Sequence, residues 1–158
     1  MTLTLTSSVT VAEPAFARPV DPVDHSPVEP GRVVAVSLSG RLWLPATIAA
    51  GTAGMHRRTG TGTVYRIDLG HHVSCWLDGD EHDGSGEVNT VATAMCAALT
   101  NGMFFGPDDA PFVCGLVLFT GTHHGGHAPT GVPGLTDTQL RHIVDVHATV
   151  IDDLDAPA

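Results

Sequence analysis

The hydrophobic pattern of the first half of the chain predicts β-strands. Residues 32–46 contain two apolar runs on either side of Ser39-Gly40, and the first run follows the two-residue period of a strand. Serine followed by glycine is a turn signal, so this stretch predicts a β-hairpin. Residues 63–69 and 73–77 show the same period on either side of a short connection, and each predicts a further strand.

A different period predicts a helix over residues 89–102. The apolar positions of this stretch fall on one helical face. We expect Asn89 to be the N-cap, because its side-chain oxygen can accept a hydrogen bond from a free amide of the first turn. Asn101-Gly102 supplies the stop signal. The many alanines make the helix slim enough to pack closely on a sheet.

Residues 135–154 predict a second helix. Thr136 and Gln139 have the spacing of a capping box, in which each side chain bonds to the backbone of the other residue. We expect His147, on the apolar face, to be a hydrogen-bonded core residue. The full apolar stripe that should pack on the sheet is Leu140, Ile143, Val144, His147, Val150, Ile151 and Leu154.

These elements lead to an expected fold class. Residues 111–121 are almost continuously apolar, which is typical of a strand buried on both faces. We therefore expect an α+β fold, with a small mixed or antiparallel sheet of four to five strands and two main helices packed on it. Residues 1–30 hold five prolines and no glycine, a composition that favours a disordered, proline-rich N-terminal tail. Residues 31–158 then form a single α+β domain.

The charge balance excludes several kinds of function. Seven basic residues, all arginine, stand against seventeen acidic residues, for a net charge of −10. Without lysine there is no phosphate-binding-loop lysine, no Schiff base and no lysine general base. An acidic chain without a basic stripe is not expected to bind nucleic acid through its phosphates. Such a surface should also repel anionic membranes, so we expect no membrane partner.

Cysteine usage and hydropathy favour a cytoplasmic protein. Cys75, Cys96 and Cys114 lie in apolar segments and lack a metal-binding spacing, so we expect three reduced, buried side chains. The N-terminal residues lack the continuous apolar run of an export signal. No stretch of the chain reaches the length of a membrane span. A cytoplasmic location is the expectation that follows.

One loop carries candidate metal chemistry. His123, His124 and His127 lie in FTGTHHGGHAPTG (119–131), where the glycines disfavour a helix. Imidazole binds transition metals such as zinc, but zinc requires three or four ligands in tetrahedral geometry. Residues from elsewhere in the chain would have to complete such a site. The alternative is a polar loop without metal, and no other cofactor is expected.

Other candidates for catalysis are weaker. His71-His72 lies in a strand connection and would meet the histidine-rich loop if both occupy the same end of the sheet. A histidine paired with an aspartate can act as a general base, but we favour exposed turn histidines. The chain has no G-x-S-x-G nucleophile elbow. The sequence therefore leaves enzymatic activity open and favours a protein that is not an enzyme.

A constellation of short motifs resembles a known family. It consists of a strand, the acidic turn LDGDEHDGSGE (77–87), a helix start with Asn89, Ala92 and Thr93, and an apolar strand closing in FTG (119–121). This resembles an uncharacterised family of small proteins from actinobacteria, their plasmids and their phages, known as domain of unknown function 3846. The resemblance implies a cytoplasmic accessory protein of mobile elements or their hosts. The family has no assigned activity and transfers no catalytic residue.

Three hypotheses for the function follow. The favoured one is a non-enzymatic interaction or regulatory domain that binds an unknown protein partner. The second is a metal-binding module or metal-dependent enzyme that uses His123, His124 and His127. The third is an acidic mimic of nucleic acid, to which the modest excess of acidic residues in the domain gives the least support.

Overall fold

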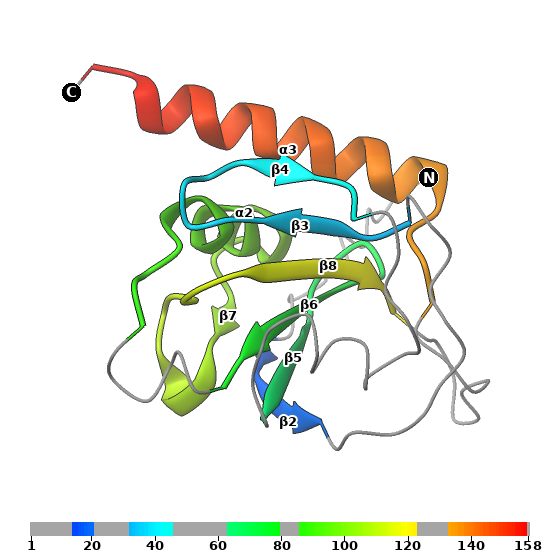
Figure 1. Cartoon of the computed structure of the whole chain (residues 1–158), viewed down its shortest axis with the longest axis vertical. Helices are drawn as coiled ribbons and strands as arrows, with labels where there is room; N and C mark the ends of the chain where they lie inside the picture. Colours follow the sequence, from blue (N-terminus) through cyan, green and yellow to red (C-terminus); the bar gives the residue numbers. More distant parts are fainter. Residues whose placement is uncertain (1–13, 21–31, 46–62, 80–85, 123–132, 158) are drawn as a thin grey trace, which may run out of the picture.

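The computed structural model describes residues 14–20, 32–45, 63–79, 86–122 and 133–157, and these form an α+β fold (Figure 1). Six strands of this part of the chain form one sheet in which every pairing is antiparallel. The strands lie in the order β2 (Arg18–Val20), β5 (Val64–Asp68), β6 (Val73–Asp78), β8 (Val117–Gly121), β3 (Val34–Val36) and β4 (Leu42–Trp43). The expected α+β class is confirmed, although the sheet has six strands where four to five are expected.

The proline-rich segment contributes two of the strands that the sequence does not predict. Ala15–Phe16 forms β1, which pairs in parallel with β7 (Phe104–Phe105), and residues 18–20 form β2 at one edge of the sheet. The expectation of a disordered tail is therefore wrong for residues 14–20, and the rest of the tail lies outside the described residues. Pro19 is compatible with β2 because an edge strand can lack an amide donor on its open side.

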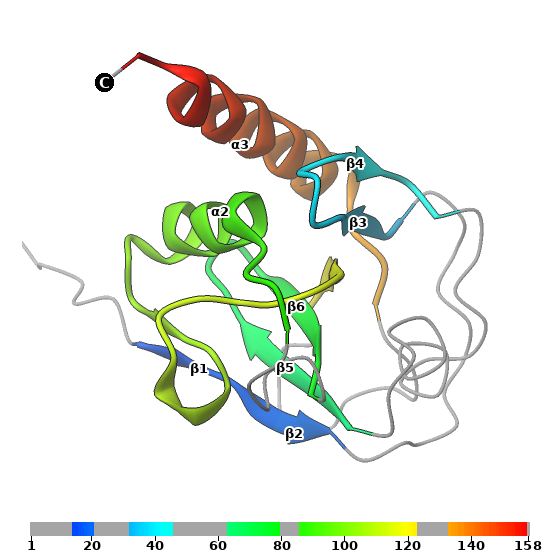
Figure 2. The same cartoon turned by 60° about the vertical axis from the view of Figure 1, so that its left-hand side comes forward.

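Two helices pack against one face of the sheet. These are α2 (Thr90–Thr100) and α3 (Asp137–Asp155), which Figure 2 shows next to each other on the same side. The alternating residues of β6 predicted to share a face, Val73, Cys75 and Leu77, all point into this layer and are completely buried. The helices and strands close the core with Met95, Cys96, Leu99, Ile143, Ile67, Val34, Val36, Val117 and Phe119.

The opposite face of the sheet is also buried where its strands are central. Its apolar residues form a second, smaller cluster, made of Val33, Ala35, Val64, Trp76 and Leu118. β8 lies between β6 and β3 and contributes Phe119 to the first core and Leu118 to the second. The prediction of a strand that is buried on both faces is therefore confirmed for β8.

The boundaries of that strand differ from the prediction. β8 begins at Val117, so the expectation of a strand is wrong for residues 111–116. Gly115 has a φ of 70°, which interrupts an extended run. Before it, Phe112 is exposed, while Val113 packs in the core beside α2. A short 3₁₀ turn, η2 (Pro107–Asp109), precedes this segment.

Both helices begin as their sequences predict. The side chain of Asn89 accepts a hydrogen bond from the Ala92 amide at 2.9 Å. Thr136 and Gln139 form the complete capping box, with each side chain bonded to the backbone of the other residue. α2 ends at Asn101, which adopts a left-handed conformation with φ 53°, as expected for a helix stop.

The apolar stripe of α3 is covered only in part. His147 is a hydrogen-bonded, partly buried residue as expected, with Nε2 2.7 Å from the Gly40 carbonyl oxygen. Val144 and Leu154, expected to pack on the sheet, are 44% and 47% exposed. In the described parts of the chain, no helix has both the length and the hydrophobicity needed to cross a membrane.

Candidate functional site

The exposed side of the helical layer contains a groove between α2 and α3. Its volume is about 460 Å³, which is within the range of ordinary binding sites. Two alanines that lie one turn apart on α2 form one wall, and α3 forms the other. The complete lining among the described residues is Ala94, Ala98, His142, Asp145, Val146, Thr149, Val150, Asp153 and Leu154.

The local sequence explains the shape of this groove. Ala94 and Ala98 add little bulk to α2, so the space beside that helix stays open. Val146 and Val150 belong to the same surface row of α3, because residues four apart lie above one another on a helix. Leu154 continues this row and is 47% exposed. The floor of the groove is therefore apolar and in contact with water.

The rim of the groove is acidic. Asp145 and Asp153 line it, and α2 contains no charged residue. Arg141 is the basic residue of α3 nearest to them, and its Nε donates to the Asp137 carbonyl oxygen, toward the start of the helix. Within the described residues, no ion pair involves Asp145 or Asp153. The groove thus presents negative charge that the fold leaves uncompensated.

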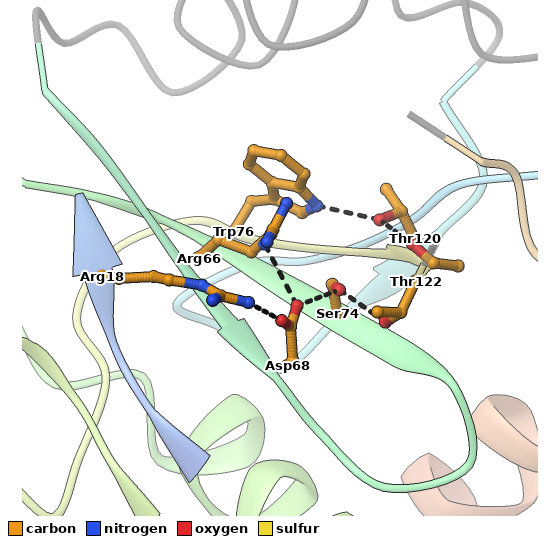
Figure 3. A network of polar contacts seen from close by, with 8 residues as sticks. Arg18, Arg66, Asp68, Ser74, Trp76, Thr120 and Thr122 are labelled. Carbon is orange, nitrogen blue, oxygen red and sulfur yellow. Dashed lines mark hydrogen bonds and ion pairs between the residues drawn. The ribbon is translucent and has the colours of Figure 1, made fainter. Parts of the chain in front are cut away.

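A polar network lies on the opposite face of the sheet, away from this groove (Figure 3). It joins β2, β5, β6 and β8 across the width of four strands. Its members are Arg18, Arg66, Asp68, Ser74, Trp76, Thr120 and Thr122. The network connects the edge strand β2 to the centre of the sheet.

Asp68 is the centre of the network. It forms an ion pair and hydrogen bond with Arg18, and its Oδ1 lies 3.1 Å from Nε of Arg66. The Ser74 hydroxyl donates to the same carboxylate at 2.7 Å. Since that hydroxyl has one proton, the Thr122 hydroxyl, 2.6 Å away, must donate to Ser74. Every hydroxyl and carboxylate at this centre therefore has a partner.

Arg66 is the most constrained charge in the network. Its guanidinium lies 5.7 Å from the centre of the Trp76 ring, and Nε is buried without a hydrogen bond among the described residues. The contact of Nε with Asp68 is thus an ion pair whose angle does not suit a hydrogen bond. Burial and, secondarily, the positive charge of Arg18 lower the pKa of Arg66. Asp68 is what holds two guanidinium groups together.

This arrangement does not provide the chemistry of a nucleophilic site. Ser74 is buried and bonds directly to Asp68, with no imidazole between them. A carboxylate that is paired with two arginines is a weak base, because the positive charges stabilise its ionised form. The network therefore holds strands together and does not activate a hydroxyl.

Three histidines lie at one end of the sheet: two come from the β5–β6 connection and one comes from α3. His71 and His72 occupy the centre of a tight turn with φ values of 61° and 60°. The Gln139 side-chain amide donates to both of their carbonyl oxygens, at 3.2 and 2.8 Å. The ring of His71 contacts the ring of His142 on α3, with centroids 4.4 Å apart. The capping residue Gln139 thus also fixes this turn against α3.

The metal candidates His123, His124 and His127 lie outside the described residues. Thr122, which precedes them, donates its amide to the His72 carbonyl oxygen at 2.8 Å. The histidine-rich loop therefore starts at the same end of the sheet as the β5–β6 turn. Among the residues that the structure describes, no group of three or more histidine, cysteine or carboxylate side chains could hold a metal.

The cysteines are placed as the sequence predicts. Cys75, Cys96 and Cys114 are all buried and form no disulfide bond, and Sγ of Cys96 lies 3.8 Å from Sγ of Cys75. Burial, followed by the contact with Cys96, raises the pKa of the Cys75 thiol. A protonated, buried thiol is a poor nucleophile.

The sequence pattern does not reveal the groove, although part of its signal is present. Val150 and Leu154 belong to the predicted apolar stripe, but a stripe alone does not distinguish residues that face the sheet from residues that face solvent.

No family model matches this chain, and no curated protein or solved structure matches it.

Proposed function

We propose that the protein is a non-enzymatic interaction domain that binds a protein partner in the groove between α2 and α3. The family resemblance adds a proposed setting, that of a cytoplasmic accessory protein of mobile elements or their hosts. Three buried cysteines that form no disulfide bond agree with a reducing compartment. The polar network supports a role without catalysis, because its hydroxyl and carboxylate groups are occupied by one another.

The observation that carries this proposal is the apolar floor of the groove. Leu154 and Val144 are the two large apolar residues of α3 with the highest exposure, and Leu154 lines the groove. A contiguous apolar depression with a polar rim is typical of a protein-binding surface. Its polar lining residues, His142, Asp145, Thr149 and Asp153, all come from α3, whereas small-molecule sites usually place polar groups so that they converge on the ligand.

Affinity capture with matched variants tests the proposal. Full-length protein carrying Leu154→Ala or Val144→Ala would be compared with the wild type in capture from cells that carry the gene. Both substitutions remove apolar surface from exposed positions of α3, and only the first one lies in the groove. We expect a protein retained by the wild type and by Val144→Ala to be reduced about five- to tenfold with Leu154→Ala. Equal retention by both variants would show that the groove is not the contact surface.

Metal binding is the second candidate function. The hydrogen bond between the Thr122 amide and the His72 carbonyl oxygen favours this function. This bond brings the start of the histidine-rich loop to the turn that His142 contacts. Ligands from the loop could then be completed by imidazoles of the turn or of α3. Zinc would suit such a set of nitrogen ligands.

Elemental analysis of protein purified without a tag tests the metal proposal. We expect about one equivalent of a divalent transition metal, which is lost in a His123→Ala/His124→Ala/His127→Ala variant. His147→Gln serves as the control, because His147 lies on another part of α3, where its ring bonds to the Gly40 carbonyl oxygen. Less than about a tenth of an equivalent in the wild type would rule out a tight site.

A further inference from the structure

From the charge around the groove we infer that its occupant is a basic amphipathic helix of another protein. This inference rests on the proposed function and specifies the partner. The groove is bounded by two neighbouring helices, and a third helix can lay an apolar face between them. From His142 to Leu154 the α3 wall extends about 18 Å, the length of roughly three helical turns.

The spacing of the rim carboxylates matches a helical partner. Asp145 and Asp153 lie on the same side of α3, two turns apart, or about 12 Å along its axis. Positive side chains two turns apart on a docked helix would reach both of them. Small alanines on the α2 wall, Ala94 and Ala98, permit close approach of a helix with larger apolar residues.

The C-terminal end of α3 favours the same partner. Asp152, Asp153 and Asp155 occupy its last turn, which has no basic residue. A helix C-terminus carries partial negative charge, so acidic residues there destabilise the helix. A positively charged partner would relieve this repulsion together with the uncompensated charge of the rim.

The same charges argue against a second copy of the chain as the occupant. A symmetric dimer through this face would place Asp145 and Asp153 of one molecule close to the same residues of the other. Neither α2 nor the last turn of α3 has a basic residue that could compensate them. The net charge of −10 further opposes self-association.

Binding of designed peptides tests the inference directly. The probe is a labelled amphipathic peptide of about fourteen residues, with leucines on one face and arginines beside them, which matches the length of the groove. Its partner in the comparison has glutamate in place of each arginine. We expect the full-length protein to bind the basic peptide and not the acidic one, with affinity that falls steeply as salt is raised. Leu154→Ala should weaken this binding and Val144→Ala should not.

Charge variants distinguish the effect of the rim carboxylates on binding from the effect of the general negative charge at the C-terminal end of α3. Asp145→Asn/Asp153→Asn should weaken binding of the basic peptide about five- to tenfold. Asp152→Asn is the matched control, because Asp152 lies in the same last turn but does not line the groove. Asp152→Asn and Asp153→Asn should each raise the melting temperature by about 1–3 °C. A substitution that stabilises the free protein while it weakens binding identifies a carboxylate that serves recognition.

Several outcomes would overturn the inference. These are equal binding of both peptides, binding of neither, or binding of the basic peptide that Asp145→Asn/Asp153→Asn leaves unchanged. Sedimentation that reveals a dimer abolished by Leu154→Ala would assign the groove to a second copy. If capture still depends on Leu154 while the peptide results are negative, the groove binds a partner of different chemistry, and the proposed function stands without this inference.

Discussion

Asn89 connects three parts of the backbone through one side chain. Its oxygen caps α2 by accepting from the Ala92 amide. Its nitrogen donates to the carbonyl oxygens of Val36, at the end of β3, and Gly115, just before β8. The side chain is completely buried. Local spacing in the sequence predicts the cap, but it does not reveal the two distant carbonyl groups.

Replacement of Asn89 by alanine should therefore cost more than the loss of an ordinary cap. The lost cap accounts for about 1 kcal/mol, and two buried carbonyl groups without a donor add about 1–3 kcal/mol each. We expect Asn89→Ala to lower the free energy of unfolding by about 3–7 kcal/mol in urea titrations. Thr136→Ala, at the exposed N-cap of α3, is the control and should cost about 1 kcal/mol. Equal losses would mean that the bonds to Val36 and Gly115 contribute nothing.

At the scale of elements, local patterns predict those that carry their own periodicity or caps. The hairpin of β3 and β4, the strands β5 and β6, and both helices follow from period and capping residues near them in sequence. β1, β2 and β7 do not: each has only two or three residues, and, unlike β3 and β4, none pairs with a strand that is next to it in sequence. Such short strands exist through pairing with distant partners, as Pro19 with Tyr65. The groove is hidden for the same reason, since it arises from the placement of two helices.

The β5–β6 turn is an element whose sequence does not suit its conformation. Two consecutive residues with φ near 60°, His71 and His72, require a conformation for which Asn-Gly is preferred. We expect His71→Asn/His72→Gly to stabilise the protein by about 1 kcal/mol, because the strain of a left-handed side chain is removed. Thermal unfolding measures the gain.

A control variant keeps the backbone strain of the β5–β6 turn and removes the ring contact of His71 with α3. His142→Ala eliminates the ring that His71 touches and leaves both turn residues unchanged, so it should not stabilise the protein. If His71→Asn/His72→Gly instead lowers the melting temperature, the ring contact is worth more than the backbone strain. The turn would then be stabilised in this form by its packing on α3.

At the scale of the whole molecule, β8 is the strand on which the sheet depends. It lies between β6 and β3, and its residues Val117, Leu118 and Phe119 are completely buried. The hydrophobic run in the sequence predicts this central position correctly, even though it misplaces the start of the strand. The arrangement of the other five strands around β8 follows from long-range pairing that periodicity does not contain.

Hydrogen exchange should distinguish the central strand β8 from an edge strand of the sheet. The amides of Val117, Leu118 and Phe119 should exchange only through global unfolding, whereas those of the edge strand β4 (Leu42–Trp43) should exchange orders of magnitude faster through local opening. Mass spectrometry or NMR under native conditions measures both. Exchange of the β8 amides within seconds would contradict the central position of this strand.

The two edge strands of the sheet limit how the protein can associate with other chains. β4 has two residues, and β2 has three, with Pro19 in the middle offering no amide. Short or proline-containing margins give an incoming strand little to pair with. Lateral growth of the sheet from one molecule into the next is therefore disfavoured at the described residues of β2 and β4, and we expect a partner to approach through side chains.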